Sequence, residues 1–216
     1  QDRVMIEAFK EGVDIHALTA SKVLGKPLGE VTRDDRRLAK TLNFGLLYGM
    51  GVAAFARSSG LNRNRAKEFI EAYFREFKEI RDWQEKTKQE VRQYGFTRTL
   101  TGRRRYLPGI NSLAPQAVAE AERAAINHPL QGLSADIMKM AMVKSKEELG
   151  RRGIWNKGAR MLLSIHDELL LEVRDDMIEE VASGVKKAME TVFDLGVPLR
   201  VEVSAGKDWG NLNKLQ

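Results

Sequence analysis

Apolar residues in the first half of the chain recur at the three- and four-residue spacing of amphipathic helices. This helical pattern extends over residues 14 to 93. Asp14 is placed to cap a helix that contains His16, because a short acidic side chain can accept hydrogen bonds from the free N–H groups of a first helical turn. Thr32 and Asp35 have the spacing of a capping box, which predicts that another helix begins there.

The next part of the pattern predicts one long helix, straight or kinked, over residues 63 to 93, after a break at Ser59-Gly60. Five large residues in it share the helical spacing expected of a buried face. They are Phe69, Tyr73, Phe77, Ile80 and Trp83. We interpret these side chains as core rather than as ligand contacts.

The second half of the chain begins with a short hairpin or loop over residues 96 to 107, which has a basic centre. Pro108-Gly109 has the chemistry of a turn. The pattern then predicts a helix over residues 115 to 127 and another over residues 133 to 149. Pro129 is expected to interrupt or restart the helical run, since proline lacks the N–H that a helix interior needs.

Short apolar runs at residues 161–165 and 169–173 lie on either side of a polar tripeptide and predict two strands with a tight turn. A helix over residues 176 to 195 and a final strand over residues 198 to 203 follow. The predicted fold is α+β: mostly helical at first, then a small antiparallel sheet with covering helices. A division of the chain is expected near residue 110.

Charge and cysteine content limit the binding partners and the cellular compartment that the chain suits. The chain has 216 residues and a formal net charge of +6, with no cysteine. A positive surface suits nucleic-acid phosphates, although basic helices can also serve only to solvate a fold. Without cysteine there is no disulfide framework and no thiolate zinc site, which suits an intracellular compartment. We find no secretory leader pattern and no apolar run long enough to cross a membrane.

One predicted helix carries a stripe of four residues at intervals of four: Arg36, Lys40, Phe44 and Tyr48. The two cations, one turn apart, can bind successive phosphates of a triphosphate, and the aromatic rings can lie against a sugar or a base. Each residue taken alone is equally compatible with an ordinary amphipathic helix that has solvated cations and buried rings.

Asp167 and Glu168 are adjacent acids in the predicted turn between the two apolar strands. Acids in hairpin turns are common and usually only solvated. The functional alternative is a Mg²⁺ site, because hard cations bind carboxylate oxygens that are held on rigid elements.

Two further groups could contact DNA. Arg103, Arg104 and Arg105 form a basic cluster suited to phosphates or groove acceptors. Arg123, Asn127 and Gln131 share one helical face if the helix continues past the nearby proline, although Asn and Gln could equally serve as helix caps.

These segments together resemble DNA polymerases of family A, the polymerase I-like enzymes, over essentially the whole chain. Residues 36 to 49 fill every position of a motif that reads Arg, three residues, Lys, three residues, Phe or Tyr, then Gly, two residues and Tyr-Gly. The sequence His166-Asp167-Glu168 between apolar runs resembles a second family motif. The basic run from Thr101 to Tyr106 resembles the family's basic hairpin, and the chain is more similar to bacterial than to viral members.

The resemblance implies an enzyme made of two parts here: residues 1–110 as fingers and residues 111–216 as the carboxy-terminal palm. It implies that Arg36 and Lys40 grip the triphosphate of an incoming dNTP, with Lys40 also counted as catalytic. Phe44 would pack on the sugar. Two more residues complete the implied dNTP site: Tyr48, near the template base, and His16, a phosphate contact.

The resemblance also implies two-metal Mg²⁺ chemistry. Asp167 would be a metal ligand and Glu168 an accessory carboxylate, and both are counted as catalytic. The implied DNA-binding residues surround the primer end and the new base pair. They are Arg103, Arg104, Arg105, Arg123, Asn127, Gln131 and His166.

Another Asp-bearing strand of the family is expected just upstream of Gln1. We therefore predict that this chain alone does not extend primers and that an amino-terminal polymerase segment, or a second chain carrying that strand, completes it. The other expected partners are primer-template DNA and dNTPs, with no membrane, in the cytoplasm at the bacterial nucleoid.

Two other functions stay open. The chain could be a non-catalytic DNA- or nucleotide-binding module, or it could resemble a single-subunit RNA polymerase, which has a related helix. Phe44 followed by Gly45, together with the His-Asp-Glu turn, favours the DNA enzyme. Phe44 in place of tyrosine further implies poor use of dideoxynucleotides.

Overall fold

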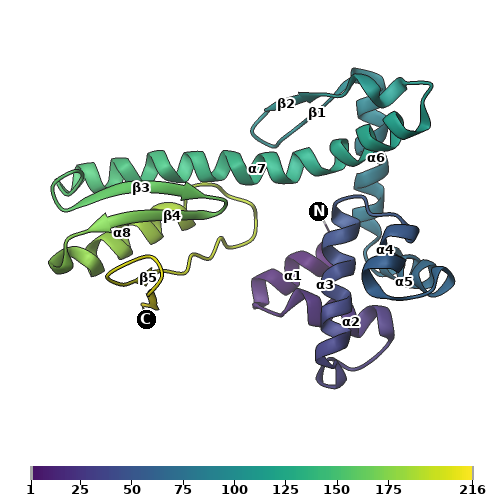
Figure 1. Cartoon of the computed structure of the whole chain (residues 1–216), viewed down its shortest axis with the longest axis horizontal. Coiled ribbons are helices and arrows are strands. Elements are labelled where there is room, and N and C mark those ends of the chain that lie inside the picture. Colours follow the sequence, from purple (N-terminus) through teal and green to yellow (C-terminus); the bar gives the residue numbers. More distant parts are fainter. Residues whose placement is uncertain (1, 216) are drawn as a thin grey trace. The chain divides into compact units, whose positions relative to one another are not determined.

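The computed structural model describes residues 2–215 and divides the chain into two compact units (Figure 1). Unit 1 ends at Gly132, and unit 2 begins at Leu133. The boundary between compact units therefore lies beyond the division expected near residue 110, and the assignment of fingers and palm stays a prediction. Within the described residues, no helix is long and apolar enough to cross a membrane.

Unit 1 begins with helices whose ends follow from local capping chemistry. Asp14 accepts hydrogen bonds from the backbone N–H groups of His16 and Ala17, and both halves of the Thr32–Asp35 capping box are formed, as predicted. The elements are α1 (Arg3–Glu11), α2 (Ile15–Leu24), the 3₁₀ turn η1 (Leu28–Glu30), α3 (Arg33–Leu47), α4 (Val52–Ser59), α5 (Arg63–Glu76) and α6 (Lys78–Tyr94).

The long helix expected over residues 63 to 93 is in fact two helices, α5 and α6. The break lies at Phe77, whose backbone leaves the helical region at φ −117° and ψ 64°. Phe77 is fully buried, and its ring centroid lies 4.8 Å from that of Tyr73. Packing of the aromatic ring, rather than a glycine or proline, thus accompanies the change of direction.

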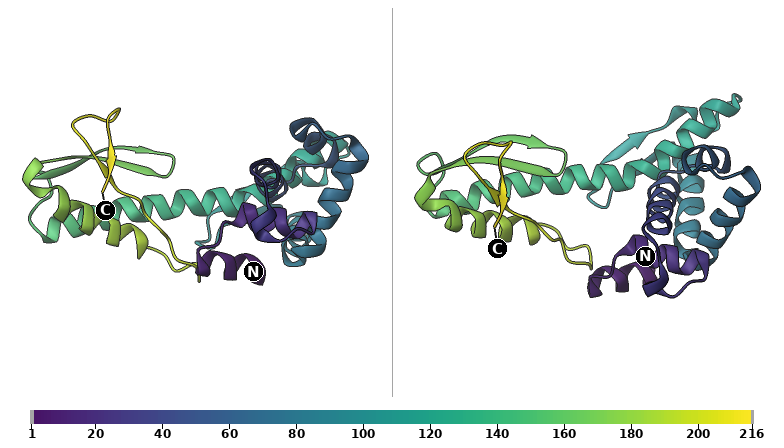
Figure 2. Two further views of the ribbon diagram at one scale, coloured as in Figure 1. Left: turned by 90° about the horizontal axis from the view of Figure 1, so that it is seen from below. Right: turned by 60° about the horizontal axis from the view of Figure 1, so that its bottom comes forward.

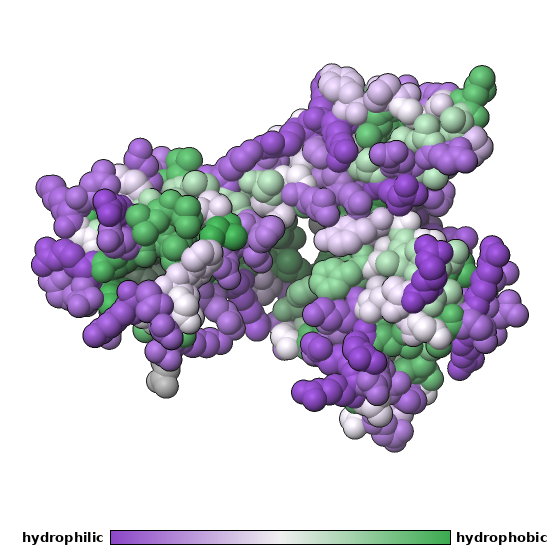
Figure 3. Space-filling model, in the orientation of Figure 1, coloured by the Kyte–Doolittle hydropathy of each residue, from purple (hydrophilic) through white to green (hydrophobic). Residues whose placement is uncertain are grey.

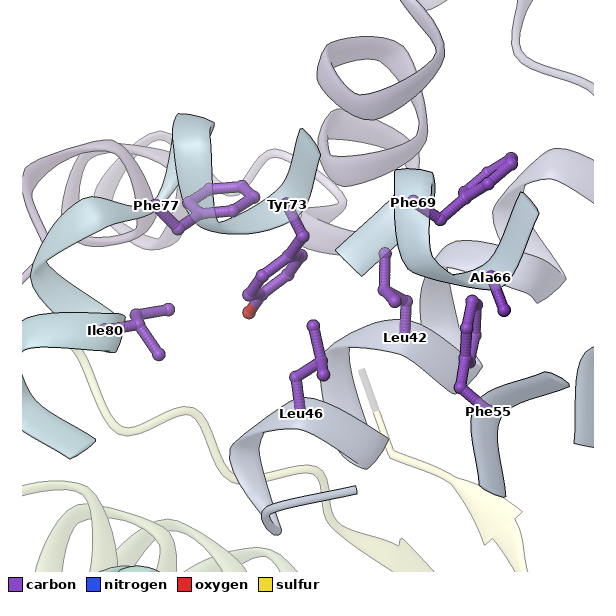
Figure 4. Close-up of a cluster of buried hydrophobic side chains, with 8 residues drawn as sticks. All are labelled: Leu42, Leu46, Phe55, Ala66, Phe69, Tyr73, Phe77 and Ile80. Atoms are coloured by element: carbon purple, nitrogen blue, oxygen red, sulfur yellow. The ribbon is translucent and has the colours of Figure 1, made fainter. Parts of the chain in front are cut away.

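The main core of unit 1 joins α3, α4, α5 and α6 (Figure 4). Side chains from all four helices converge in this cluster. They are Leu42, Leu46, Phe55, Ala66, Phe69, Tyr73, Phe77 and Ile80. Burial of large apolar side chains, each worth about 1.5–3 kcal/mol, fixes α3 firmly on one side and leaves its opposite side in solvent.

A hairpin of β1 (Phe96–Arg98) and β2 (Arg104–Tyr106) follows, then the 3₁₀ turn η2 (Pro108–Asn111) and α7 (Pro115–Arg151). The prediction of an interruption at Pro129 is wrong, because α7 runs unbroken through it. Proline at 129 cannot donate to the carbonyl of Ala125, four residues earlier. The hydroxyl of Thr97 in β1 donates to that oxygen instead, at 3.2 Å, so the buried acceptor is satisfied.

Unit 2 contains the rest of α7 and a hairpin of β3 (Ala159–Ile165) and β4 (Glu168–Val173), as predicted. The 3₁₀ turn η3 (Asp175–Met177), α8 (Ile178–Glu190) and the two-residue strands β5 (Ser204–Ala205) and β6 (Asn213–Lys214) complete it. The strand expected over residues 198 to 203 is not formed. Its backbone bonds elsewhere: the N–H of Val201 donates to Glu190 Oε1 at 3.0 Å.

The core of unit 2 lies where the end of α7 and α8 pack on the β3–β4 hairpin (Figures 1 and 2). Leu149, Ile154, Ala159, Val181 and Val185 form it. Hydrophobic surface remains exposed over the hairpin, where Leu162 and Leu163 face solvent (Figure 3). The fold is therefore α+β, mostly helical with small antiparallel sheets, as the sequence predicts.

Candidate nucleotide- and DNA-binding sites

The polar face of α3 carries the stripe that the sequence predicts. Arg36 and Lys40 are exposed, and the rings of Phe44 and Tyr48 are 46% and 38% exposed. The two rings therefore lie outside the core of unit 1, beside the two cations on the same face of α3.

Asp14 holds Arg36 in place. One carboxylate oxygen of Asp14 caps α2, and the other accepts a hydrogen bond from Arg36 Nε at 2.7 Å. Partial burial opposes ionisation, but the bonds from Arg36 and from the backbone of Ala17 and His16 outweigh it and lower the pKa of Asp14. A single acid thus ties the start of α2 to the cationic stripe of α3.

His16 is oriented by a buried polar network. The amide nitrogen of Asn43 donates to His16 Nδ1 and to Thr19 Oγ1, each at 3.0 Å, and the Thr19 hydroxyl donates to the carbonyl of Ile15 at 2.8 Å. Because Nδ1 is an acceptor here, the neutral ring carries its proton on Nε2. The free side of the ring is therefore a hydrogen-bond donor.

Electrostatics keep His16 neutral near physiological pH. Burial lowers its pKa, Arg36 and Lys40 lower it further, and Asp14 partly opposes them. A neutral donor beside two cations is suited to binding an anion without adding a third charge to a crowded site.

Three rings form a continuous series along α3. The centroids of His16 and Phe44 are 5.5 Å apart, and those of Phe44 and Tyr48 are 6.4 Å apart with an interplanar angle of 24°. The structure thus brings together all five residues predicted for dNTP binding. The two cations lie toward the start of α3, the rings of Phe44 and Tyr48 lie toward its end, and His16 on α2 lies beside Phe44.

The end of α3 lies against α7. Gly49 has a positive φ of 74°, and a Cβ on it would lie 3.3 Å from Cγ of Arg123. Glycine is favoured at this position for both reasons, conformation and close approach. In addition, buried Gln84 donates to the carbonyl of Leu46 at 2.7 Å, which also accepts from the N–H of Gly49 at 3.0 Å, and so ties α6 to the end of α3.

Because α7 is continuous, Arg123, Asn127 and Gln131 share one face of it, as their spacing of four requires. Arg123 and Gln131 are exposed. The side-chain oxygen of Asn127 is buried without a hydrogen-bond partner in the described structure, although buried polar atoms are almost always bonded. The structure does not test the predicted role of these side chains in DNA binding.

The three predicted hairpin arginines do not share one face. Arg105 pairs with Thr97, which bonds α7, so Arg103 and Arg105 belong to the side of the hairpin nearer α7. Arg104 lies on the opposite side, where its guanidinium stacks 4.6 Å from the ring centroid of Phe96. Because side chains alternate between the two faces of a strand, the three arginines that are consecutive in sequence lie on two faces of the hairpin.

The predicted acidic turn lies in unit 2. Ile165 pairs with Glu168, so His166 and Asp167 alone form the loop between β3 and β4. His166 has a φ of 51°, a left-handed conformation that costs most residues free energy and is enriched at functional sites. A bulge between Met161 and Leu163 further twists β3 near the turn.

The donor set at this turn fits part of a magnesium site. Asp167 and Glu168 offer exposed carboxylate oxygens, the ligands that Mg²⁺ prefers. Among residues 2–215, however, no three side chains of the metal-binding types lie close enough together to hold an ion. Any complete site would need further ligands.

Asn43 and Thr19 are parts of the site that the sequence analysis does not predict. Asn43 is polar on a face that the helical pattern makes apolar, which is a signal that a buried polar partner exists. Gly49 is the last residue of the family motif over residues 36 to 49, and a glycine there suggests close approach or bending. The structure shows the close approach and identifies the neighbouring element as α7, which the sequence does not specify.

Comparison with known proteins identifies the family of the chain. The model of the family "DNA polymerase family A" matches residues 1–211, and the chain belongs to this family. Over 208 residues it is 47% identical to a thermostable DNA polymerase I of Thermus thermophilus, and over 209 residues 42% identical to DNA polymerase I of Pseudomonas aeruginosa. These alignments cover 96% and 97% of this chain.

A solved structure is also similar. The polymerase domain of Pol1 from M. smegmatis, in complex with DNA primer-template and dNTP, superimposes with a TM-score of 0.87 at 38% identity over 92% of this chain. The chain covers 35% of that structure and only 24% and 23% of the Thermus and Pseudomonas proteins. It therefore spans about a quarter of the length of its curated relatives.

Proposed function

We propose that this chain supplies the dNTP-binding helix, part of the DNA-binding surface and one carboxylate position of a DNA-directed DNA polymerase. The reaction is nucleotidyl transfer from a dNTP to the 3′ end of a primer, directed by a template strand. The observation that carries the proposal is the order of groups along α3: an oriented guanidinium, an ammonium and two stacked rings, beside a neutral His16 donor.

The proposed binding mode follows from this order. Arg36, held by Asp14, and Lys40, which has no ion-pair partner within the described chain, bind phosphate oxygens together with the Nε2 proton of His16. Phe44 lies against the sugar, and Tyr48 offers a flat face near the template base. Lys40 also stabilises the charge that develops on the leaving pyrophosphate.

Asp167 is the proposed anchor of catalytic Mg²⁺, with Glu168 as an accessory carboxylate and His166 beside the primer end. Bound Mg²⁺ would supply activation of the primer hydroxyl and neutralisation of the triphosphate. Two ions need more ligands than this turn offers, so we propose that a segment of a longer chain, or a second chain, provides another carboxylate. Arg103, Arg105, Arg123, Asn127 and Gln131 would contact primer-template DNA, at the bacterial nucleoid.

A primer-extension assay tests the proposal. The chain alone is expected to give no extension, whereas the chain joined to an upstream polymerase segment should extend a primer with Mg²⁺ and dNTPs. Asp167→Ala in the joined protein should lower kcat by about 10²–10³-fold, since removal of one strong electrostatic contributor costs this much. Robust extension by the chain alone, or by the Asp167→Ala protein, would contradict the proposed site.

The alternative is a non-catalytic module that binds DNA or nucleotide through the same basic surfaces. It predicts DNA binding by the joined protein without extension under any condition. Comparison of dNTP with rNTP incorporation separates the proposed enzyme from an RNA polymerase. Phe44→Tyr in the active protein should raise incorporation of dideoxynucleotides, and no change would count against the assignment of α3.

A further inference from the structure

The outer face of the β1–β2 hairpin carries four large side chains. Phe96 pairs with Tyr106, and Arg98 pairs with Arg104. Paired residues in an antiparallel ladder point to the same side, and residues two positions apart on one strand do so as well. Thr97 points the other way, toward α7, where its hydroxyl bonds the carbonyl of Ala125. All four side chains therefore project from the face that turns away from α7.

Three aromatic rings and one guanidinium group lie close together on this face, and two of the rings are largely exposed. The ring centroids of Phe96 and Tyr106 are 5.6 Å apart, and the ring of Tyr94 at the end of α6 adds a third, 6.4 Å from Phe96. Tyr94 and Tyr106 are 59% and 67% exposed. The guanidinium of Arg104 lies 4.6 Å from the centre of Phe96, so a planar cation extends the series of rings.

The arginine pair opposes the folding of the hairpin. Like charges directly opposite each other in a ladder destabilise it. Neither Arg98 nor Arg104 takes part in an ion pair within residues 2–215, so no acid of the described chain neutralises them. A polyanion bound across both side chains would remove this repulsion.

We propose that this face, defined by Tyr94, Phe96, Arg98, Arg104 and Tyr106, is a binding platform for single-stranded DNA. Bases stack on the exposed rings and on the Arg104 plane, and the two guanidinium groups bind the backbone phosphates. Aromatic rings interleaved with cations are the general means of binding single strands without sequence preference. The platform is separate from the stripe on α3 and from the Arg103 and Arg105 side of the hairpin.

Single strands fit this face better than duplexes do. Stacking requires free base faces, which a duplex hides inside its own stack. The choice of DNA over RNA rests on the proposed function, in which an unpaired template strand must be present. Binding by the platform does not require nucleotide transfer, so it can be measured without any active polymerase.

Charge reversal at Arg98 gives the sharpest test. Arg98→Glu converts the repulsive pair into an opposite-charge pair with Arg104, so it should keep or raise Tm while it weakens single-strand binding. Arg57→Glu on α4 is the matched control, because it changes the net charge of the full chain equally at an exposed arginine outside the platform. The probe is a fluorescent oligo-dT of about 12 nucleotides, a length within the usual site sizes, titrated by anisotropy at several salt concentrations.

The expected result is roughly a tenfold loss of oligo-dT affinity for Arg98→Glu. The slope of the logarithm of the binding constant against the logarithm of the salt concentration should also become shallower, by about 0.7 for each phosphate no longer bound. Tyr106→Ala should weaken binding on the order of tenfold with an unchanged salt slope, since it removes a stacking surface and no charge. Neither variant should weaken binding of a blunt duplex by as much.

Several results would overturn the platform. One is affinity for oligo-dT within twofold of the unmodified chain in both variants. Another is an equal loss in Arg57→Glu, which would show an effect of net charge alone, and a third is an equal loss on the duplex. Failure of primer extension by the joined polymerase would leave the oligo-dT result intact, so the two proposals fail separately. An oligo-rU probe that binds as tightly as oligo-dT would overturn the preference for DNA.

Discussion

At the scale of single residues, Asn43 and Asp14 organise the nucleotide-binding surface without belonging to the exposed stripe. Asn43 donates its amide hydrogens to His16 and Thr19, and the two oxygens of Asp14 accept from a helix end and from Arg36. Buried polar groups that are fully bonded hold their neighbours in one geometry. Buried Asn43 thus sets the position of His16 from beneath, whereas Asp14, itself exposed, holds Arg36 at the surface.

Stability should depend on pH through His16. Burial and the nearby cations lower its pKa in the folded chain below the ordinary value of 6.5. As the pH is lowered, His16 is therefore protonated in the unfolded chain at a higher pH than in the folded chain. The stability that neutral His16 contributes is present above pH 6.5 and declines as the pH falls below this value. Tm measured from pH 8 to pH 5.5 should fall less steeply for His16→Gln. Equal slopes would contradict a depressed pKa.

The left-handed turn residue gives a second prediction at this scale. His166 has a φ of 51°, which β-branched residues adopt only at high cost. His166→Val should lower the free energy of unfolding of the full chain by about 1–3 kcal/mol in urea denaturation. His166→Gly should be neutral or slightly stabilising, and His166→Asn is the control that tolerates the same backbone. Equal stability of all three variants would mean that the turn has another conformation.

At the scale of elements, a side-chain hydrogen bond from β1 replaces a backbone hydrogen bond that α7 lacks. Proline at position 129 deprives Ala125 of its helical donor, and Thr97 from the hairpin replaces that donor. Thr97→Val should therefore cost about 1–3 kcal/mol, because it leaves a buried carbonyl without a partner.

The same replacement should cost much less in a Pro129→Ala background, where the N–H of residue 129 can bond Ala125. A double-mutant cycle in chemical denaturation would measure a coupling of roughly 1 kcal/mol. Additive effects of the two substitutions would show that the hydroxyl does not compensate for the proline.

Local chemistry made much of this fold predictable from sequence. The caps at Asp14 and Thr32 act within a few residues, and the structure has them as predicted. The tight turn between the two apolar strands is also present, but it is one residue shorter than predicted, because Glu168 pairs with Ile165 and begins β4. Helix α1 was missed even though Asp2 and Gly12 cap its two ends. The stripe of α3 could be predicted for the same reason, since helical period alone places its members together.

The rest depends on tertiary contacts that no local pattern records. The break at Phe77 accompanies burial of a ring, and the continuity of α7 depends on a hydroxyl from another element. The strand expected near Val201 is not formed, and the N–H of Val201 bonds an acid of α8 instead of a strand. Asn43 and Gly49 belong to the site only because of what packs against them.

At the scale of the whole molecule, the described chain has separate hydrophobic cores in its two units. Thermal unfolding should therefore show more than one transition by calorimetry. Leu149→Ala removes a fully buried side chain from the core of unit 2 and should destabilise one transition by about 2–5 kcal/mol. Leu42→Ala, in unit 1, is the matched control and should shift the other transition. Movement of both transitions together in either variant would contradict independent units.

The turn between β3 and β4 has a consequence for the length of the chain. Only two residues separate the paired positions Ile165 and Glu168, and side chains alternate between faces along each strand. One residue gained or lost in either strand beside the turn would slip the register and turn Leu171, which packs against the core of unit 2, to the opposite face. The number of residues beside this turn is thus constrained more tightly than their type: a substitution keeps the register, whereas an insertion or a deletion shifts it.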